Sequence, residues 1–593
     1  MSEATTTKHE QSRWDLGDLF PSHDGKEMDT AIEALKDRVA EFEGMRESLS
    51  ADMDEEEFLD MVQYLETTTR QAYRIGQFAS LWFSEDTQNQ KAQTFQAKVN
   101  QLSAEMQNRV LFFSLWWKAQ DDETAQRLMR NAGEFEYYLE QIRNFKPYTL
   151  TEPEEKIINI KDVTGSSALQ NLYSSITDRY EFKVEVDGEV QSLTRGGLMR
   201  HVYSPDPDLR ARAYQELYRV YGEDGPILGQ MYQSLVRDYH NENIDFRHFE
   251  SPISVRNLSN DIPDEVVNTL LDVAEKNAGV FQRFFKLKAK LLGMKQLRRY
   301  DIYAPVASSD KQYDYDYAVN LTLDSFRDFD PKVEALARKV FVQSHVDSEV
   351  RKGKQGGAFC SSGDPELTPW VLVNYNGTAR DVSTVAHELG HAIHAMLADH
   401  HNVFNTHSSL PLAETASTFA EMLLVDRLLE EETDEAVRRD ILFAQVDDAY
   451  ATIMRQIFFA LYEREAHQKV QDGASVDDLN EAYMENLKTQ FGDALEIGDE
   501  FKWEWVSIPH IYYYPFYVYA YAFGQLLVFA LYQQYKEEGD AFKPRYIELL
   551  SAGGSMSPED ILKKAGVDMR DPAFWQGGFD FVANMVDELE KVA

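Results

Sequence analysis

Long runs of apolar residues at helical spacing constrain the fold of this chain more than any other feature. In these runs an apolar side chain recurs every three or four positions, and Gly and Pro are scarce. The clearest runs cover residues 94–117, 208–241 and 263–292. Strand patterns are short: a hairpin-like stretch at 180–190 that turns at Asp187-Gly188, and an extended segment at 370–375. The sequence therefore predicts a mainly α-helical protein with a small β-sheet.

The length of 593 residues indicates more than one packing unit. A single hydrophobic core stops growing well below this size, so two units or one two-lobed body are expected. A boundary is predicted near Gly196-Gly197, where the hairpin-like stretch ends and a new helical series begins. We expect a disordered tail at 1–13, an amino-terminal helical lobe at 14–200 and a second body, carrying the chemistry described below, at 201–593.

The charge of the chain limits its partners. Lys and Arg number 60 against 101 Asp and Glu, so the net charge is -41. Such a surface repels phosphates and anionic lipids, and neither nucleic acid nor a membrane is expected as a partner. Residues 511–532 carry no formal charge and are long enough to cross a bilayer, but they include seven Tyr together with Pro, Gly and Gln. This composition favours a buried helix with a Tyr-lined face.

Cys360 is the single cysteine of the chain, which excludes an internal disulfide and suits a reducing compartment. We interpret it as a small buried apolar side chain. Residues 1–13 are polar and have no apolar centre, so they do not resemble a secretory signal. A cytoplasmic location is therefore expected.

Residues 387–391 carry the pattern HExxH in a setting that a metal-binding helix requires. Thr378 and Asp381 have the spacing of a capping box, and apolar residues follow at helical spacing. His387 and His391 lie one turn apart, where two imidazoles can reach a single tetrahedral zinc ion. Glu388 then lies beside the attacking water as a general base. The alternative is a chance match on an ordinary amphipathic helix.

His394 follows the same motif but does not fit the same ion. It lies seven residues beyond His387, which is about 10 Å along a helix axis. The longer pattern of another zinc peptidase class is absent, because Leu397 stands where its last His would be. His394 is expected to support the ligands or to have a structural role.

Two carboxylates compete for the place of a third ligand. Glu414 and Glu421 lie seven residues apart on a helical run that follows Pro411, so they share one face. Only one of them can reach the metal, and the other can accept an N–H from a liganding imidazole and fix its tautomer. Spacing alone leaves open which carboxylate has which role.

Taken together, these segments resemble the oligoendopeptidase F branch of the thimet oligopeptidase family of zinc metallopeptidases. The matching pieces extend over nearly the whole chain, and the later ones are the most specific. They cover residues 14–20, 300–305, 357–359, 374–378, the HExxH helix, 414–417 and 509–521.

The resemblance implies a ligand set, a fold and an activity. It implies that Glu414 completes a site for one zinc ion per chain and that Glu421 supports a ligand. It also implies a mostly helical, two-lobed body with a deep channel that admits short peptides and excludes folded proteins. Family members typically cleave internal bonds of oligopeptides in the cytoplasm, so oligopeptides are the expected substrates.

The family also places a His and Tyr residues from the region 509–521 over the reacting carbonyl. His510 matches the His, and Tyr512 and Tyr519 are predicted as oxyanion or substrate donors. For each Tyr, a packed aromatic stripe is the alternative. The extended segment 370–375 is predicted as an edge that pairs with a substrate backbone, or else as an ordinary core strand. Gly356 and Gly357 would let a substrate backbone approach closely.

Two other functions are considered beside the zinc endopeptidase. One is a zinc carboxydipeptidase of the same family, and the other is a non-catalytic peptide-binding protein on a peptidase fold. The intact base Glu388 argues against the second, because a binding protein has no need of it. Side-chain preference, natural substrates and oligomeric state are left open by the sequence.

Overall fold

The computed structural model describes residues 8–306 and 311–592 of the chain. By its contacts the chain divides into two compact units, and each unit is built from three separate segments. Unit 1 comprises Met1–Lys146, Asp310–Glu431 and Gln534–Val567, and unit 2 comprises Pro147–Ser309, Glu432–Gln533 and Asp568–Ala593. The boundary expected near Gly196-Gly197 falls inside unit 2, where the first hairpin contacts the long helix that follows it.

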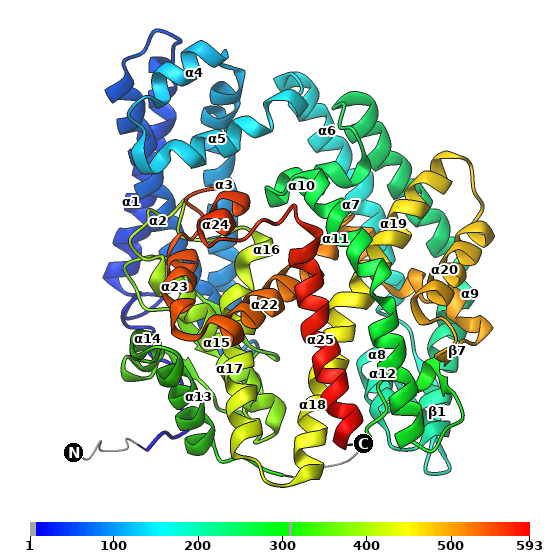
Figure 1. The fold of residues 1–593 in the computed structure, drawn as a ribbon. Coiled ribbons are helices and arrows are strands. Elements are labelled where there is room, and N and C mark those ends of the chain that lie inside the picture. The colour runs from blue at the N-terminus through cyan, green and yellow to red at the C-terminus, as the bar shows by residue number, and fades with distance from the viewer. Residues whose placement is uncertain (1–7, 307–310, 593) are drawn as a thin grey trace. The chain divides into compact units, whose positions relative to one another are not determined.

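Unit 1 is helical apart from one three-stranded sheet, and α1, α2 and α3 lie side by side in it (Figure 1). Its helices are α1 (Lys26–Gly44), α2 (Glu55–Glu85), α3 (Gln90–Ala119), α4 (Asp122–Met129), α5 (Glu136–Asn144), α13 (Tyr315–Phe329), α14 (Pro331–Val342), α15 (Ala379–Leu397), α16 (Leu410–Ala413), α17 (Thr415–Glu431), α23 (Lys543–Ser551) and α24 (Pro558–Lys564). Its strands are β4 (Val346–Asp347), β5 (Phe359–Ser361) and β6 (Trp370–Leu372).

Unit 2 is also helical and holds two small two-stranded sheets. Its helices are α6 (Glu152–Thr164), α7 (Ser166–Thr177), α8 (Arg195–Met199), α9 (Pro207–His240), α10 (Pro252–Asn260), α11 (Asp264–Lys276), α12 (Ala278–Leu291), α18 (Glu435–Ala449), α19 (Arg455–Gln471), α20 (Val476–Phe491), α21 (His510–Tyr513), most of α22 (Tyr519–Glu538) and α25 (Pro572–Val592). Its strands are β1 (Phe182–Val186), β2 (Glu189–Leu193), β3 (Leu297–Arg298) and β7 (Leu495–Glu496).

The predicted mainly α-helical class is confirmed. α3 contains the predicted run 94–117, whereas the run 263–292 is divided at Asn277 into α11 and α12. The predicted hairpin is formed by β1 and β2, which pair antiparallel. Its two turn residues, Asp187 and Gly188, both have positive φ, at 52° and 82°. This is the two-residue turn whose twist matches that of the flanking strands.

The segment 370–375 is not an edge, and this part of the prediction is wrong. β6 lies in the middle of its sheet, paired in parallel with β4 and antiparallel with β5. Trp370 and Leu372 are buried in a core that also contains Trp14 and Phe78. Since both main-chain sides of β6 are already paired, the outer strands of this sheet are β4 and β5.

The start of the described chain is fixed to unit 1. The Ser12 amide donates to Oγ of Ser348 at 3.1 Å, and the Gln11 side chain donates to the Tyr375 carbonyl at 2.8 Å. Residues 8–13 therefore do not belong to the expected disordered tail, and residues 1–7 lie outside the described residues.

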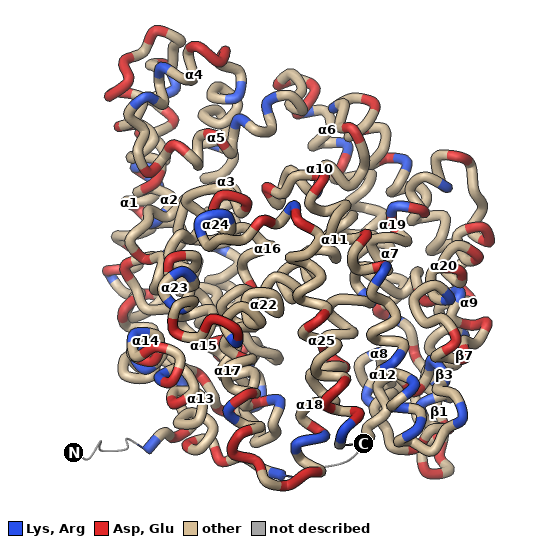
Figure 2. Tube along the Cα trace, viewed as in Figure 1, with Lys and Arg blue, Asp and Glu red and all other residues tan. Residues whose placement is uncertain are grey.

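The charged residues do not gather in one place along the chain. Figure 2 shows Asp and Glu on almost every labelled helix, with Lys and Arg interspersed among them. Among the described residues, no helix is both long and apolar enough to cross a membrane. The uncharged stretch 511–532 forms α21, a turn and the first part of α22, most of whose side chains there are buried.

Candidate metal centre

Helix α15 carries the HExxH residues and begins as the sequence predicts. Thr378 is its N-cap: the Thr378 side chain accepts from the Asp381 amide at 3.2 Å, and the Asp381 carboxylate accepts from the Thr378 amide at 2.9 Å. A reciprocal capping box satisfies two of the N–H groups that a helix start leaves without partners. The same carboxylate also accepts from the Asn376 amide at 3.0 Å, which fixes the chain entering the helix.

Gly390 lets helix α17 come unusually close to α15. A Cβ atom at Gly390 would lie 2.6 Å from the carbonyl oxygen of Ala416 and 2.6 Å from Cα of Ser417. Both are main-chain atoms that cannot rotate away. Glycine therefore permits the approach that brings Glu414, directly before α17, to the His residues of α15.

Three donor atoms converge between these helices. Nε2 of His387 and Nε2 of His391 each lie 3.4 Å from Oε2 of Glu414, and the ligand atoms all lie within 4.8 Å of one another. Across residues 8–306 and 311–592, this is the one group of three His, Cys, Asp or Glu side chains close enough to share an ion. Two imidazoles and one carboxylate fit zinc, with a fourth position left for water or substrate.

Glu421 lies on the other side of the His387 ring. Its Oε1 is 2.6 Å from Nδ1 of His387, while Glu414 faces Nε2 of the same ring. The two carboxylates that sequence spacing could not tell apart thus occupy different positions around one imidazole. Glu414 is itself held by Ser417, whose hydroxyl donates to Oε2 of Glu414 at 2.7 Å.

The acidic groups shift the pKa values of this cluster. Burial disfavours the charged form of His387, but the hydrogen bond and charge of Glu421 outweigh it and raise the pKa of His387 to about 9. Burial likewise acts against the charged form of Glu414, but His391 and His387 lower the pKa of Glu414 to about 2. The two His residues therefore favour the ionised form of Glu414, which is the form that binds a metal ion.

Glu388 is buried on α15 beside the two predicted His ligands. Burial is the main cause that raises the pKa of Glu388, while the neighbouring His387 and His391 oppose it. The charge of Glu388 also acts on Cys360 of β5, whose thiol has its pKa raised mainly by burial. A carboxylate whose pKa is shifted towards neutrality can both take and return a proton.

His394 is buried and stands outside the cluster of donor atoms. Burial, and then the charges of His391 and His407, lower the pKa of His394 to about 4. Its ring is therefore neutral in the physiological range, as a structural residue requires.

The remaining predicted residues belong to unit 2. His510 begins α21, and burial lowers the pKa of its ring. Tyr512 is 1% exposed, stacks on Tyr173 and donates to the Leu228 carbonyl at 3.3 Å. Tyr519 is fully buried, and its hydroxyl accepts from Asn260 at 2.9 Å.

Two other tyrosines surround His510. The rings of Tyr517 and Tyr521 each have their centroid 6.1 Å from that of His510. Tyr521 is exposed, whereas Tyr512 and Tyr519 have the burial of a packed aromatic stripe. The period of the Tyr-rich segment could not separate these two sets, because a turn at 514–518 interrupts the helix.

Tyr546 is a supporting residue that the sequence did not reveal. Its buried hydroxyl donates to the Thr415 carbonyl at 3.0 Å, and its ring stacks on Phe419 at 4.1 Å. Both contacts hold the first turn of α17, directly after Glu414. No spacing rule connects positions 131 residues apart, so only the fold exposes this contact.

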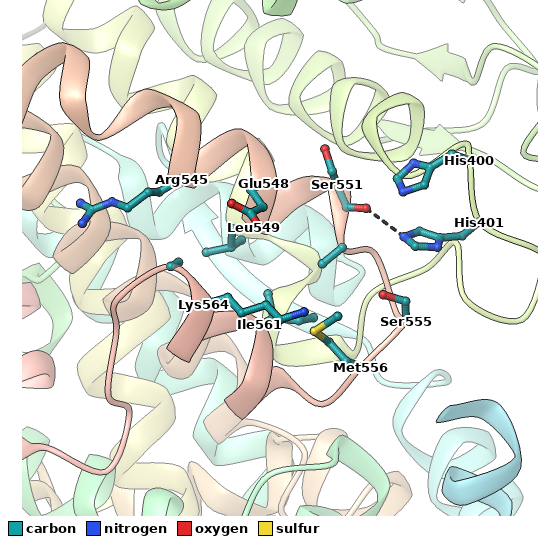
Figure 3. Close-up of a pocket in the computed structure, with 12 residues that line it drawn as sticks. His400, His401, Arg545, Glu548, Leu549, Ser551, Ser555, Met556, Ile561 and Lys564 are labelled. Carbon is teal, nitrogen blue, oxygen red and sulfur yellow. Dashed lines mark hydrogen bonds between the residues drawn. The ribbon is translucent and has the colours of Figure 1, made fainter. Parts of the chain in front are cut away.

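A separate pocket of about 220 Å³ lies elsewhere in unit 1. Its lining includes His400, His401, Arg545 and Lys564 but none of the three donor residues. Figure 3 shows the His401 ring directed at the Ser551 carbonyl, 3.0 Å away, with Arg545 at the opposite end of the lining. Arg545 is paired with Glu538 at 2.6 Å, so its charge is already matched.

Comparison with known families decides the class of this protein. The model of peptidase family M3 matches residues 200–581, which is more than half of the chain. The chain belongs to peptidase family M3. The model named Oligopeptidase F matches residues 116–182. The predicted family and enzyme class, a metalloendopeptidase of the oligoendopeptidase F type, are thereby confirmed.

Relatives of this M3 peptidase align over nearly their whole length. Oligopeptidase PepF of Bacillus subtilis is 27% identical over 98% of this chain and 87% of the relative. The chromosomal oligoendopeptidase F of Lactococcus lactis subsp. cremoris is 27% identical over 98% of this chain and 97% of its own.

Solved structures share the fold. A peptidase from Chlamydophila abortus superposes with a TM-score of 0.88 at 25% identity, covering 98% of both chains. Oligoendopeptidase-F from Enterococcus faecium gives a TM-score of 0.72 at 24% identity, covering 96% of this chain and 99% of that one.

Proposed function

We propose that this M3 peptidase is a zinc-dependent endopeptidase that hydrolyses internal bonds of short oligopeptides. One observation carries the proposal: Nε2 of His387, Nε2 of His391 and Oε2 of Glu414 converge within 4.8 Å beside the buried carboxyl of Glu388. The names of the relatives, oligopeptidase and oligoendopeptidase, support the substrate class.

One zinc ion per chain would be held by His387, His391 and Glu414. When bound, zinc would polarise the scissile carbonyl and make a water molecule more acidic. Glu421 would accept a hydrogen bond from Nδ1–H of His387, so that Nε2 of this ring is left to bind the metal. Ser417 keeps the Glu414 carboxylate turned towards the two rings.

Glu388 would act as the general base and then as the general acid. It would take a proton from the attacking water and deliver it to the leaving amine, so no covalent acyl-enzyme is needed. The raised pKa of Glu388, caused mainly by burial, suits a carboxyl that must hold this proton between the two steps. The same carboxyl argues against a merely peptide-binding protein.

His510 would donate a hydrogen bond to the oxyanion, as the resemblance implies. Burial lowers the pKa of His510, which favours the neutral ring with one N–H to donate. Tyr512 and Tyr519 stay predicted donors, but their hydroxyls are buried and bonded within unit 2. Tyr517 and Tyr521, which flank His510, are the better candidates for a substrate contact.

The substrate backbone would pair with β5, an outer strand of the sheet in unit 1. Cys360 lies on β5, and the charge of Glu388 adds to the burial that raises the pKa of its thiol. Gly357 precedes this strand with φ 81°, and a Cβ there would meet no atom within 4 Å. This open approach replaces the role first expected of the segment 370–375.

A peptide blocked at both ends tests the proposal and separates it from a carboxydipeptidase. We expect internal cleavage, read by mass spectrometry, in a protein that carries one zinc ion per chain. A channel that admits only short peptides further predicts that folded proteins survive. Cleavage restricted to peptides with a free carboxyl end would favour the dipeptidase, and activity untouched by chelators would exclude zinc. The cytoplasmic location stays a prediction.

A further inference from the structure

The turn between α21 and α22 has a conformation that its own residues do not favour. Phe516 has φ 57°, in the left-handed region that residues other than glycine avoid. It is nevertheless buried to 1% exposure. Contacts from outside the turn must therefore hold this conformation.

A fully buried carboxyl on α19 provides one such contact. Oε1 of Glu463 accepts from the Phe516 amide at 3.0 Å. One helical turn further along, the ring of His467 packs on the Phe516 ring with 4.7 Å between centroids. Two polar residues of one face of α19 therefore contact the turn, Glu463 at the main chain of Phe516 and His467 at its ring.

Burying these polar side chains costs folding free energy, because polar groups inside a fold normally need hydrogen-bond partners. Among the residues that the structure describes, Oε2 of Glu463 and both ring nitrogens of His467 have no hydrogen-bond partner. The hydroxyl of Tyr232, whose ring packs against that of His467, also has no hydrogen-bond partner among the described residues. An apolar side chain at position 463 would avoid the cost of desolvating a carboxyl. What the carboxyl provides instead is the hydrogen bond that it accepts from the Phe516 amide.

Arg256 of α10 holds the same turn from another element. Its Nε faces the Pro515 carbonyl at 3.5 Å, and its guanidinium lies 5.7 Å from the centroid of the Tyr517 ring. Tyr517 in turn stacks beside His510. A chain of contacts therefore leads from Glu463 through Phe516 and Tyr517 to the ring of His510.

We propose that Glu463 is a positioning residue that fixes the 514–517 turn and thereby the aromatic surroundings of His510. The proposal rests on the role of His510 proposed above. Glu463 contacts no substrate in this account, and it acts only through the main chain of Phe516.

Two substitutions at the same position test the acceptor. Glu463→Gln keeps an oxygen that can accept from the Phe516 amide, and Glu463→Leu removes it. We expect Glu463→Gln to keep at least half of kcat, and Glu463→Leu to lower kcat about 10-fold or more with zinc content unchanged. Gln233→Leu is the matched control, because it deletes a buried polar side chain of unit 2 that donates to the Ala474 carbonyl at 2.7 Å and not to the 514–517 turn. It should lower the Tm without lowering kcat.

A double-mutant cycle with His510→Ala identifies the route of the effect. If Glu463 acts through His510, adding Glu463→Leu to His510→Ala should cost less than 2-fold further. Full additivity of the two losses would overturn the proposal, as would equal kcat values for the Gln and Leu variants. Normal activity of His510→Ala alone would instead refute the proposed role of His510.

Arg256→Met keeps the inference testable if Glu463→Leu fails to fold. It removes the second contact to the turn from a partly exposed position, and it should also lower kcat with zinc retained. Unchanged kcat in this variant would contradict the proposal.

Discussion

Oε1 of Glu421 lies 2.6 Å from Nδ1 of His387, on the opposite side of the ring from Glu414. A carboxylate at this distance fixes the tautomer of the imidazole and its orientation towards the metal. The two glutamates, seven residues apart in the chain, therefore lie at different nitrogens of one imidazole, as the proposed ligand and its supporting residue require.

Removing Glu421 should weaken zinc binding without abolishing it. We expect Glu421→Ala to lower zinc affinity by about 10- to 100-fold, because all three donor atoms remain while the His387 ring loses its partner. Glu414→Ala removes a donor and should lower affinity far more. Competition titration with a chelator of known affinity measures both, and the reverse order would exchange the roles of the two residues.

Glu388 can be separated from the ligands by comparing metal content with activity. Glu388→Gln has nearly the same size and leaves both imidazoles in place, so zinc should stay bound while kcat falls by about 100-fold or more. His391→Ala should lose zinc and activity together. Elemental analysis beside peptide cleavage reads both quantities. Turnover near the normal level in Glu388→Gln would exclude the general-base role.

Gly390→Ala tests whether the helix approach sets the metal site. The added methyl would lie 2.6 Å from two main-chain atoms of α17, so the helices must separate. Overpacking of this kind costs about 1–3 kcal/mol, and Glu414 should move away from the His residues. We expect a lower Tm and weaker zinc binding.

The control for this change is Gly76→Ala. Gly76 also lies within a helix, but a Cβ there meets nothing within 4 Å. Alanine is the better helix former, so this variant should keep or raise the Tm and leave zinc binding unchanged. If Gly390→Ala behaved in the same way, the close approach would not matter to the site.

The stability of the protein should depend on pH through Glu463. Burial raises the pKa of Glu463 to about 8, against about 4.5 for an exposed carboxyl. The folded protein therefore binds the proton more tightly, and this contribution is fully present below about pH 4.5 and lost as pH rises through 8. Arg256, Tyr232, Tyr239 and His467 face this carboxyl or its Phe516 partner.

Replacing Glu463 by Gln removes this titration. The Tm of Glu463→Gln minus that of the unchanged protein should rise between pH 5 and pH 8, by the equivalent of at most a few kcal/mol. Gln233→Leu should show a nearly constant difference over the same range. A flat difference for Glu463→Gln would mean that the carboxyl does not titrate in this window.

The sequence was sufficient where the signal is local. The helix of the HExxH residues, the capping box at Thr378 and the hairpin turn at Asp187-Gly188 each depend on residues close together in the chain, and all were predicted. The position of β6 was not, since an apolar run reads alike in the middle and at the edge of a sheet. Only pairing with β4 and β5 distinguishes the two.

Contacts between distant segments account for the rest of what was missed. No sequence pattern near Glu414 indicates that Tyr546 bonds the Thr415 carbonyl. Likewise, no pattern near Phe516 indicates that its amide donates to Glu463. The Tyr-rich segment illustrates the same limit. Its composition indicated an aromatic stripe, but only the turn at 514–518 decides which rings face His510.

Unit 1 is assembled from three stretches of chain, and this has a consequence for biosynthesis. Residues 310–431, which carry the donor atoms, leave the ribosome well before residues 534–567. Tyr546 belongs to the last stretch, and its hydroxyl secures the Thr415 carbonyl beside Glu414. Domains usually fold as units, so unit 1 is completed only after residues 534–567 have been translated. A nascent chain therefore presents its histidines before the first turn of α17, directly after Glu414, is secured, and peptidase activity is deferred until residues 534–567 have been made.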